Sequence, residues 1–387
     1  MDSLRILLKQ ELEKLDKTLS QLTVTQHNEP QTFSNAVIGN SSAMNAQESL
    51  AHQQQPISLD STDLLNVQPR MITIAGSISR QATLLAIALK GNDAKEVSSA
   101  CSALMDFSAE LVQLVCNTPV DVGRSLKRHL ILAAQSLLCG LVNLQSTDAS
   151  ALEALSQSTY ARSDTACLSI NSAAGGVWAA CNDIANVPPT NAALAVVLLE
   201  RYDDQLNDAI QECQDLLNGP TDNEDSFGED NDEGGWNELV VGNSTKAHGY
   251  STADLSSQDM DWVRDVQSMI KTCRLSFKMV MANLSGLARP TAKENQVIDV
   301  LVDLALRCVE KADNAVCDIN LPLIDCDEDL YVAVDELGSV QTHFLNTISD
   351  LYPDSQHQSS SATTTQTCLQ LCLDKTILLI DKLKITL

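Results

Sequence analysis

The chain has 387 residues, 44% of them hydrophobic, which is enough for two or three domains with apolar cores. Its net charge of -26 repels nucleic-acid phosphates and anionic lipid, and favours basic protein partners. We therefore expect no direct nucleic-acid binding. The longest apolar run, residues 192–199, is far shorter than a membrane span, so no membrane helix is expected either.

The first predicted helix lies at the N-terminus, where leucines recur at spacings of three and four from Leu4 to Leu22. Residues 25–60 are rich in Gln, Asn and Ser, and we interpret them as a flexible polar loop. The N-terminus resembles no secretory leader, and most of the twelve cysteines fall on apolar helix faces. These features favour an intracellular protein with free thiols.

Helical spacing continues over five further segments, which end at residue 217. The second segment begins near Pro69, and the third follows Asp93, a predicted N-cap with Glu96 three residues later. The remaining predicted helices follow Pro119, span Asp164–Ile184, and run from Thr190 to Leu217.

An acidic tract overlaps the end of the last of these helices and separates it from the next helical segment. Residues 202–245 contain thirteen acidic residues and no Lys or Arg, and glycines are interspersed in the second half of this stretch. Dense like charge and little apolar surface predict a disordered, extended linker, which we place at residues 219–251. Thr221 and Ser226 each precede an acidic residue by three positions, a pattern favoured by acid-directed kinases, although such short patterns also arise by chance.

The C-terminal part is again helical, and its strongest periodicity runs from Trp262 to Leu284. Three more helices are predicted at Glu294–Cys317, Asp327–Leu351 and Thr367–Ile385, with a Ser/Thr-rich loop at residues 352–366 before the last. Strand signals are nearly absent, and aromatic residues make up 3% of the chain.

The predicted fold is therefore all-α, with two antiparallel helical bundles joined by the acidic linker. We expect an N-terminal bundle at residues 1–218, the linker at 219–251, and a C-terminal bundle at 252–387. The boundary follows from the composition change at the acidic tract.

No catalytic, cofactor-binding or metal site is predicted. The six histidines are isolated, and the cysteines lack the paired spacing of zinc ligands. Phosphate-binding loops and nucleophile or zinc-protease motifs are also missing from the sequence. We therefore expect a protein that is not an enzyme and needs no cofactor.

A basic stripe consists of four residues that share one side of the helix around Trp262: Arg264, Lys271, Arg274 and Lys278. Its simplest interpretation is a solvated helix face. The alternative hypothesis is a partner-binding surface that the acidic tract covers by charge attraction.

A family resemblance appears in the fifth predicted helix and the joint that follows it. The run Gly176-Val177-Trp178-Ala179-Ala180-Cys181, Ile184 and the joint Val187–Asn191 resemble cyclin-D-binding proteins, also called Grap- and cyclin-D-interacting proteins. The order of features agrees: a leucine-rich first helix, this segment, an acidic centre and a helical C-terminal half.

This resemblance implies a non-enzymatic, all-helical regulator of cytoplasm and nucleus. It further implies binding to D-type cyclins and signalling adaptors, lower cyclin-dependent phosphorylation of retinoblastoma protein, and restrained cell-cycle entry. The family is also described as helix-loop-helix without a basic region. Residues 163–200 contain no Lys or Arg, so helices in this segment lack the cations that contact DNA phosphates, which agrees with pairing or dimerisation between helices.

Partner capture by an apolar helix face is the mechanism that we expect, with Trp178 and Trp262 as candidate anchors. Burial in the bundle is the alternative for each tryptophan. The competing function is a cytoskeletal or signalling adaptor related to vinculin or the catenins, because those proteins are also helical bundles.

Overall fold

The structure is a computed structural model of the chain. It describes Lys17 and residues 67–91, 93–157, 164–218, 256–319, 328–351 and 360–386. The regular elements in these ranges are helices, so the all-α prediction is confirmed. The chain forms two compact units, Met1–Leu194 and Ala195–Leu387.

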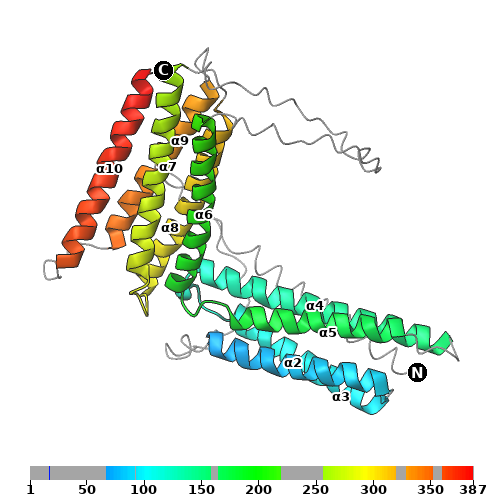
Figure 1. Cartoon of the computed structure of the whole chain (residues 1–387). Coiled ribbons are helices and arrows are strands. Elements are labelled where there is room, and N and C mark those ends of the chain that lie inside the picture. The colour runs from blue at the N-terminus through cyan, green and yellow to red at the C-terminus, as the bar shows by residue number, and fades with distance from the viewer. Residues whose placement is uncertain are drawn as a thin grey trace, which may run out of the picture. The chain divides into compact units, whose positions relative to one another are not determined.

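The described residues of the first unit form four long helices, which lie side by side in Figure 1. They are α2 (Val67–Gly91), α3 (Ala94–Cys116), α4 (Arg124–Gln157) and α5 (Asp164–Ala185), with a short 3-10 turn, η2 (Val120–Val122), before α4. The packed pairs are α2 with α3, α3 with α4, α4 with α5, and α5 with α2, so the helices close into a ring around one core. Each helix contributes buried aliphatic residues at helical spacing.

Local chemistry sets the start of α3. The Asp93 side chain accepts hydrogen bonds from the backbone N–H groups of Lys95 and Glu96, at 3.1 and 3.2 Å. These contacts satisfy two of the donors that a helix N-terminus leaves without partners. The predicted N-cap is therefore confirmed.

The start of α4 depends on a contact between distant parts of the chain. Gly123 ends η2 with φ of 103°, and the backbone N–H of Leu126 donates to the side-chain oxygen of Asn191 at 3.1 Å. Asn191 is buried and lies against Gly123, where a Cβ would overlap its amide. Glycine is thus required twice, by backbone conformation and by space.

Replacing Gly123 with alanine is expected to destabilise the first unit by about 1–3 kcal/mol, because φ is strained and the Asn191 cap must shift. Urea unfolding followed by circular dichroism measures the change. The matched control is Gly76→Ala in α2, where nothing lies within 4 Å of the added methyl group. Gly76→Ala should raise the free energy of unfolding of the first unit by about 0.5–1 kcal/mol, because alanine favours the helix more than glycine does. Equal effects of the two substitutions would contradict the prediction.

Three helices of the first unit are long and apolar enough to cross a membrane, judged by length and composition only: α2, α3 and residues Arg124–Thr147 of α4. None of the three contains an uninterrupted apolar run as long as residues 192–199, because polar residues are interspersed in each helix. In each helix, 44% of the most apolar window is buried inside the protein. Helix packing therefore uses much of this apolar surface, and the expected lack of membrane binding stays a prediction.

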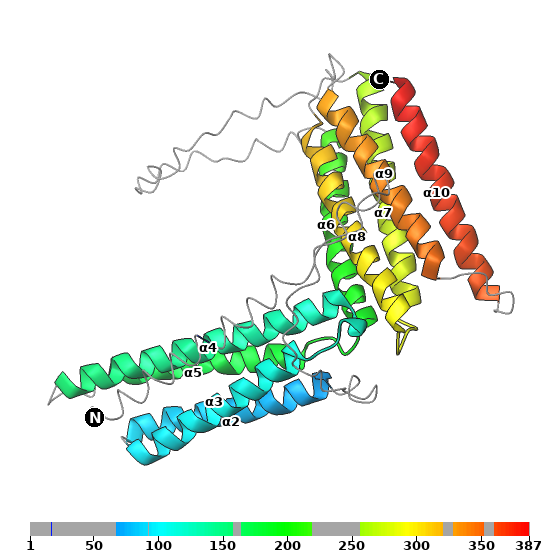
Figure 2. The ribbon, with the colours of Figure 1, turned by 180° about the vertical axis from the view of Figure 1, so that it is seen from behind.

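The second unit contains most of α6 (Asn191–Asn218), together with α7 (Ser257–Leu284), α8 (Ala292–Cys317), α9 (Glu328–Leu351) and α10 (Ser360–Thr386). Polar contacts give the helix directions. Lys382 near the end of α10 pairs with Asp265 in the first half of α7, whereas Cys372 in the middle of α10 approaches Ser276 in the second half of α7. These two helices are therefore antiparallel, and Figure 2 shows α10 beside α7 and α9 at one edge of the unit.

The core of the second unit contains two aromatic rings packed edge to face. Phe277 of α7 and Phe344 of α9 are fully buried, with ring centroids 5.1 Å apart and planes inclined by 60°. That edge-to-face geometry stabilises aromatic pairs beyond their buried area. Capping boxes start α7 at Ser256 and α8 at Thr291, so the unit combines a tight core with well-defined helix starts.

Two boundaries differ from the sequence analysis. Residues of α6 from Ala195 onward belong to the second unit, whereas composition had placed all of α6 in the N-terminal bundle. The reason is that side chains of α7 bind α6: Gln267 donates to the carbonyl of Ile210, and Arg274 donates to Asp203. Local composition does not encode such contacts between distant residues. In addition, α10 begins at Ser360, inside the predicted loop at residues 352–366. The acidic linker at 219–251, the polar loop at 25–60 and the N-terminal leucine helix lie outside the described residues.

Candidate partner-binding face

Trp178 lies at the surface of α5, held against α2. Its indole N–H donates to the hydroxyl of Thr83 at 3.1 Å, and Thr83 in turn donates to the carbonyl of Ser79. The Trp178 side chain nevertheless remains 41% exposed. The ring is therefore oriented by a hydrogen bond while much of its apolar surface faces solvent, a combination suited to an interface anchor.

The α2–α5 seam beneath this ring is fixed along its whole length. Gln68 donates to the carbonyl of Val187, the Cys181 thiol donates to the carbonyl of Ala75, and Lys90 donates to the side-chain oxygen of Asn171. Residues with increasing numbers on α2 contact residues with decreasing numbers on α5, so the two helices are antiparallel. Trp178 consequently sits on a rigid support.

Cys181 lies one turn from Trp178 and belongs to this support. Burial raises the pKa of its thiol to about 11. The group is therefore protonated at neutral pH, donates the hydrogen bond to Ala75, and packs as a small apolar side chain. It supplies neither charge nor a reactive nucleophile to the site.

Two exposed aliphatic residues lie on α2 beside Thr83. Leu84 is 51% and Ile87 is 60% exposed, and Ile87 follows Thr83 by one helical turn. On α5, Gly175 and Gly176 precede Trp178, and nothing lies within 4 Å of where their Cβ atoms would be. The surroundings of the indole are thus apolar and uncrowded.

Two cations flank these apolar residues on α2. Arg80 donates to the hydroxyl of Ser77 at 3.4 Å, and Lys90 donates to the amide oxygen of Asn171 at 2.7 Å. Both partners are neutral. We name this surface the α2–α5 face, and its residues are Arg80, Thr83, Leu84, Ile87, Lys90 and Trp178.

The second candidate anchor, Trp262, has a different environment. Its side chain is 2% exposed in the core of the second unit, and its indole N–H has no hydrogen-bond partner among the described residues. A partner cannot reach this ring while the unit is folded. Core burial, the alternative weighed for both tryptophans, therefore describes Trp262 and not Trp178.

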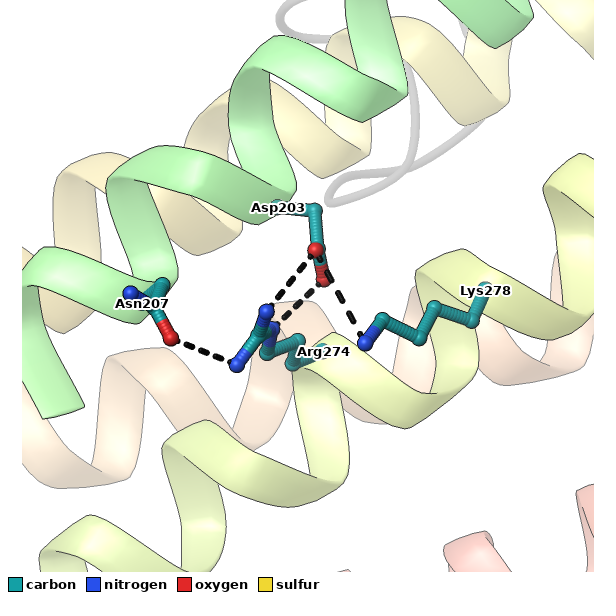
Figure 3. A network of polar contacts seen from close by, with 4 residues as sticks. All are labelled: Asp203, Asn207, Arg274 and Lys278. Carbon is teal, nitrogen blue, oxygen red and sulfur yellow. Dashed lines mark hydrogen bonds and ion pairs between the residues drawn. The ribbon is translucent and has the colours of Figure 1, made fainter.

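Two residues of the basic stripe on α7, Arg274 and Lys278, contact side chains of α6 (Figure 3). Arg274 makes two hydrogen bonds to the Asp203 carboxylate of α6, at 2.8 and 3.2 Å, and a third to Asn207 at 2.6 Å. Lys278 lies 3.9 Å from the same carboxylate. Arg274 and Lys278 therefore have an internal role, because their contacts with Asp203 and Asn207 attach α6 to α7. This role competes with the hypothesis that the stripe binds a partner.

The other two stripe residues also have contacts close by. Lys271 donates to the side-chain oxygen of Gln267 at 2.7 Å, and Arg264 pairs with Asp261 one turn away at 2.8 Å. Residues 202–218 of the acidic tract form the end of α6, and their Asp203 contacts Arg274 and Lys278. Covering of the stripe by residues 219–251 stays a prediction, because these residues lie outside the described ones. The phosphorylation candidates Thr221 and Ser226 also lie there.

Sequence reasoning missed Leu84, Ile87 and the two cations as parts of a site. Leu84 and Leu85 are adjacent apolar residues of the sequence, and adjacent residues of a helix point about 100° apart. The structure buries Leu85 and exposes Leu84. The lack of any Asp or Glu from residue 67 to residue 91 was the available signal for a cationic face.

The described part of the chain contains no group of three or more His, Cys, Asp or Glu side chains placed to hold a metal ion. The cysteines that can be described are free thiols, and several lie in helix cores. Cys273, for example, is buried near Cys308 and Cys372, and burial raises the pKa of its thiol. Cys273 therefore acts as a protonated packing group.

Comparison with known proteins gives two matches. Residues 70–219 match the family model described as Grap2 and cyclin-D-interacting, N-terminal. Cyclin-D1-binding protein 1 of Pongo abelii is 24% identical over 273 residues, which is 66% of this chain and 68% of that protein. The family match includes the whole α2–α5 face.

Proposed function

We propose that this chain belongs to the Grap2- and cyclin-D-interacting protein family and is a non-enzymatic interaction protein that binds a D-type cyclin through the α2–α5 face. The family is one of interaction proteins, and the name of the relative refers to cyclin D1. The observation that carries the proposal is the oriented but exposed Trp178 ring, which lies inside the family match.

The proposed consequence of binding is negative regulation. A bundle that occupies part of a cyclin surface competes with other proteins for that surface, so phosphorylation by the associated kinase falls. This role requires the protein in the compartments where cyclins act, and we propose both cytoplasm and nucleus. No chemical step by this chain is needed, since occupancy alone changes kinase activity.

Replacing Trp178 with alanine tests the proposal. We expect the variant to keep its helical circular-dichroism spectrum and to bind a purified D-type cyclin at least about tenfold more weakly, because aromatic anchors dominate interface energies. Isothermal titration calorimetry measures the affinity. The matched control is Leu132→Ala on α4, another exposed apolar residue of the same unit, which should bind as tightly as the unchanged protein.

Unchanged cyclin affinity in a folded Trp178→Ala variant would remove the α2–α5 face from the proposal. The regulatory role has its own measurement, namely phosphorylation of retinoblastoma protein by the cyclin-dependent kinase with and without this chain. Purification of bound proteins from native cells distinguishes cyclin binding from the adaptor alternative. Actin or junction proteins in place of cyclins would favour the adaptor.

A further inference from the structure

We infer that the α2–α5 face recognises an acidic amphipathic helix of its protein partner. The inference rests on the proposed function and deepens it, because it states which kind of element the face accepts. Three features of the first unit carry it: unusual charge, unneutralised cations, and the spacing of apolar and cationic residues along α2.

The charge of α2 is opposite to that of the protein. The chain carries a net charge of -26, yet α2 contains Arg70, Arg80 and Lys90 and no Asp or Glu. Among the other α-helices of the described chain, each has at least one acidic residue. A cationic helix on an acidic protein attracts a negatively charged partner segment and orients its approach.

The two cations on the face have no carboxylate partner among the described residues. Arg80 contacts the Ser77 hydroxyl and Lys90 contacts the Asn171 amide, both neutral groups. Arg70 differs, since it lies 3.9 Å from Glu110 of α3. Two positive charges thus remain available on the side of α2 that carries the exposed apolar residues.

The spacing along α2 matches a helical ligand. Arg80, Leu84, Ile87 and Lys90 follow one another at intervals of four, three and three residues, so they form a ridge on one side of the helix. The cations are about 15 Å apart along the helix axis, at 1.5 Å per residue. The complement is a helix with apolar residues over one or two turns and carboxylates about three turns apart.

Trp178 and the neighbouring glycines extend the surface onto α5. The indole supplies an apolar edge beside the ridge, and the open space at Gly175 and Gly176 lets partner side chains approach the helix backbone. A bare phosphate chain would leave these apolar groups exposed, so the chemistry favours a peptide helix over nucleic acid.

Two synthetic peptides test the inference with the full-length protein. Both are helix-forming and place leucines at i, i+4 and i+7; one carries glutamates flanking the leucines and the other carries lysines. Fluorescence anisotropy of labelled peptide measures binding. We expect the glutamate peptide to bind at least about tenfold more tightly than the lysine peptide, with a difference that shrinks at high salt.

The double variant Arg80→Glu with Lys90→Glu should reverse that preference and favour the lysine peptide. The matched control is Arg70→Glu, a cation of the same helix that faces α3 and should leave the preference unchanged. Equal binding of the two peptides, or a preference that charge reversal leaves unaltered, would overturn the inference. Tighter binding of a DNA or RNA oligonucleotide than of the glutamate peptide would also overturn it.

Cyclin binding by the same variants separates this inference from the proposed function. If Trp178→Ala weakens cyclin binding and the charge-reversed variant binds normally, the cyclin proposal stands and the acidic-helix inference fails. If the peptides behave as expected and Trp178→Ala leaves cyclin affinity unchanged, the face accepts acidic helices and the cyclin proposal for this face fails.

Discussion

Replacing Phe277 with alanine is expected to lower the free energy of unfolding of the second unit by about 3–5 kcal/mol. The ring is fully buried and packs edge to face against Phe344, with ring centroids 5.1 Å apart. Truncation removes the transfer energy of the ring, leaves a cavity, and also removes the aromatic contact with Phe344. Surrounding helices can close such a cavity only in part, because interiors are densely packed.

Urea unfolding measures this loss, and the buried Trp262 on the same helix offers a fluorescence signal for the unit. The matched control is Leu275→Ala, two residues away on α7, whose side chain is half-exposed. Its expected cost is below about 1 kcal/mol, since little apolar area returns to water. Similar midpoints for the two variants would show that Phe277 is not part of the core.

Arg274→Ala is expected to destabilise the second unit by about 2 kcal/mol. The substitution removes the two hydrogen bonds to Asp203 and the contact with Asn207, which join α7 to α6. Asp203 is largely buried, so its carboxylate loses its main partner without regaining full hydration. Lys278, 3.9 Å away, offsets only part of that loss.

Arg264→Ala is the control for Arg274, because it belongs to the same stripe and pairs with Asp261 at an exposed site. Its expected effect is within about 0.5 kcal/mol. A double-mutant cycle with Asp203→Ala isolates the pair energy, which should be clearly larger for Asp203–Arg274 than for Asp261–Arg264. A coupling energy near zero would mean that the Asp203–Arg274 pair does not stabilise the attachment of α6 to α7.

Much of the helix framework could be predicted from the sequence, because it depends on short-range chemistry. The Asp93 cap, the helix after it and the segment around Trp262 follow from residues within one or two turns of each other. Leucine spacing and capping side chains act locally, so they are visible without knowledge of the fold. The family resemblance around Trp178 was also correctly identified from a short run of residues.

The candidate site could be predicted only in part. Trp178 and Trp262 both occur in helices with apolar periodicity, and a large aromatic in such a helix can be core or anchor. Their exposures, 41% and 2%, depend on which neighbouring helix covers each ring. The cations Arg80 and Lys90 gained significance only when packing placed them beside the exposed apolar residues of α2.

The sequence by itself determined that the chain is helical, strongly acidic and free of recognisable catalytic motifs, since these properties belong to residues and their near neighbours. Tertiary structure alone decided three matters. It joined α6 to the second unit through Asp203 and Arg274, it buried Trp262, and it left Trp178 at the surface. Each of these outcomes depends on which helix faces lie together, and contacts between residues distant in the chain set that pairing.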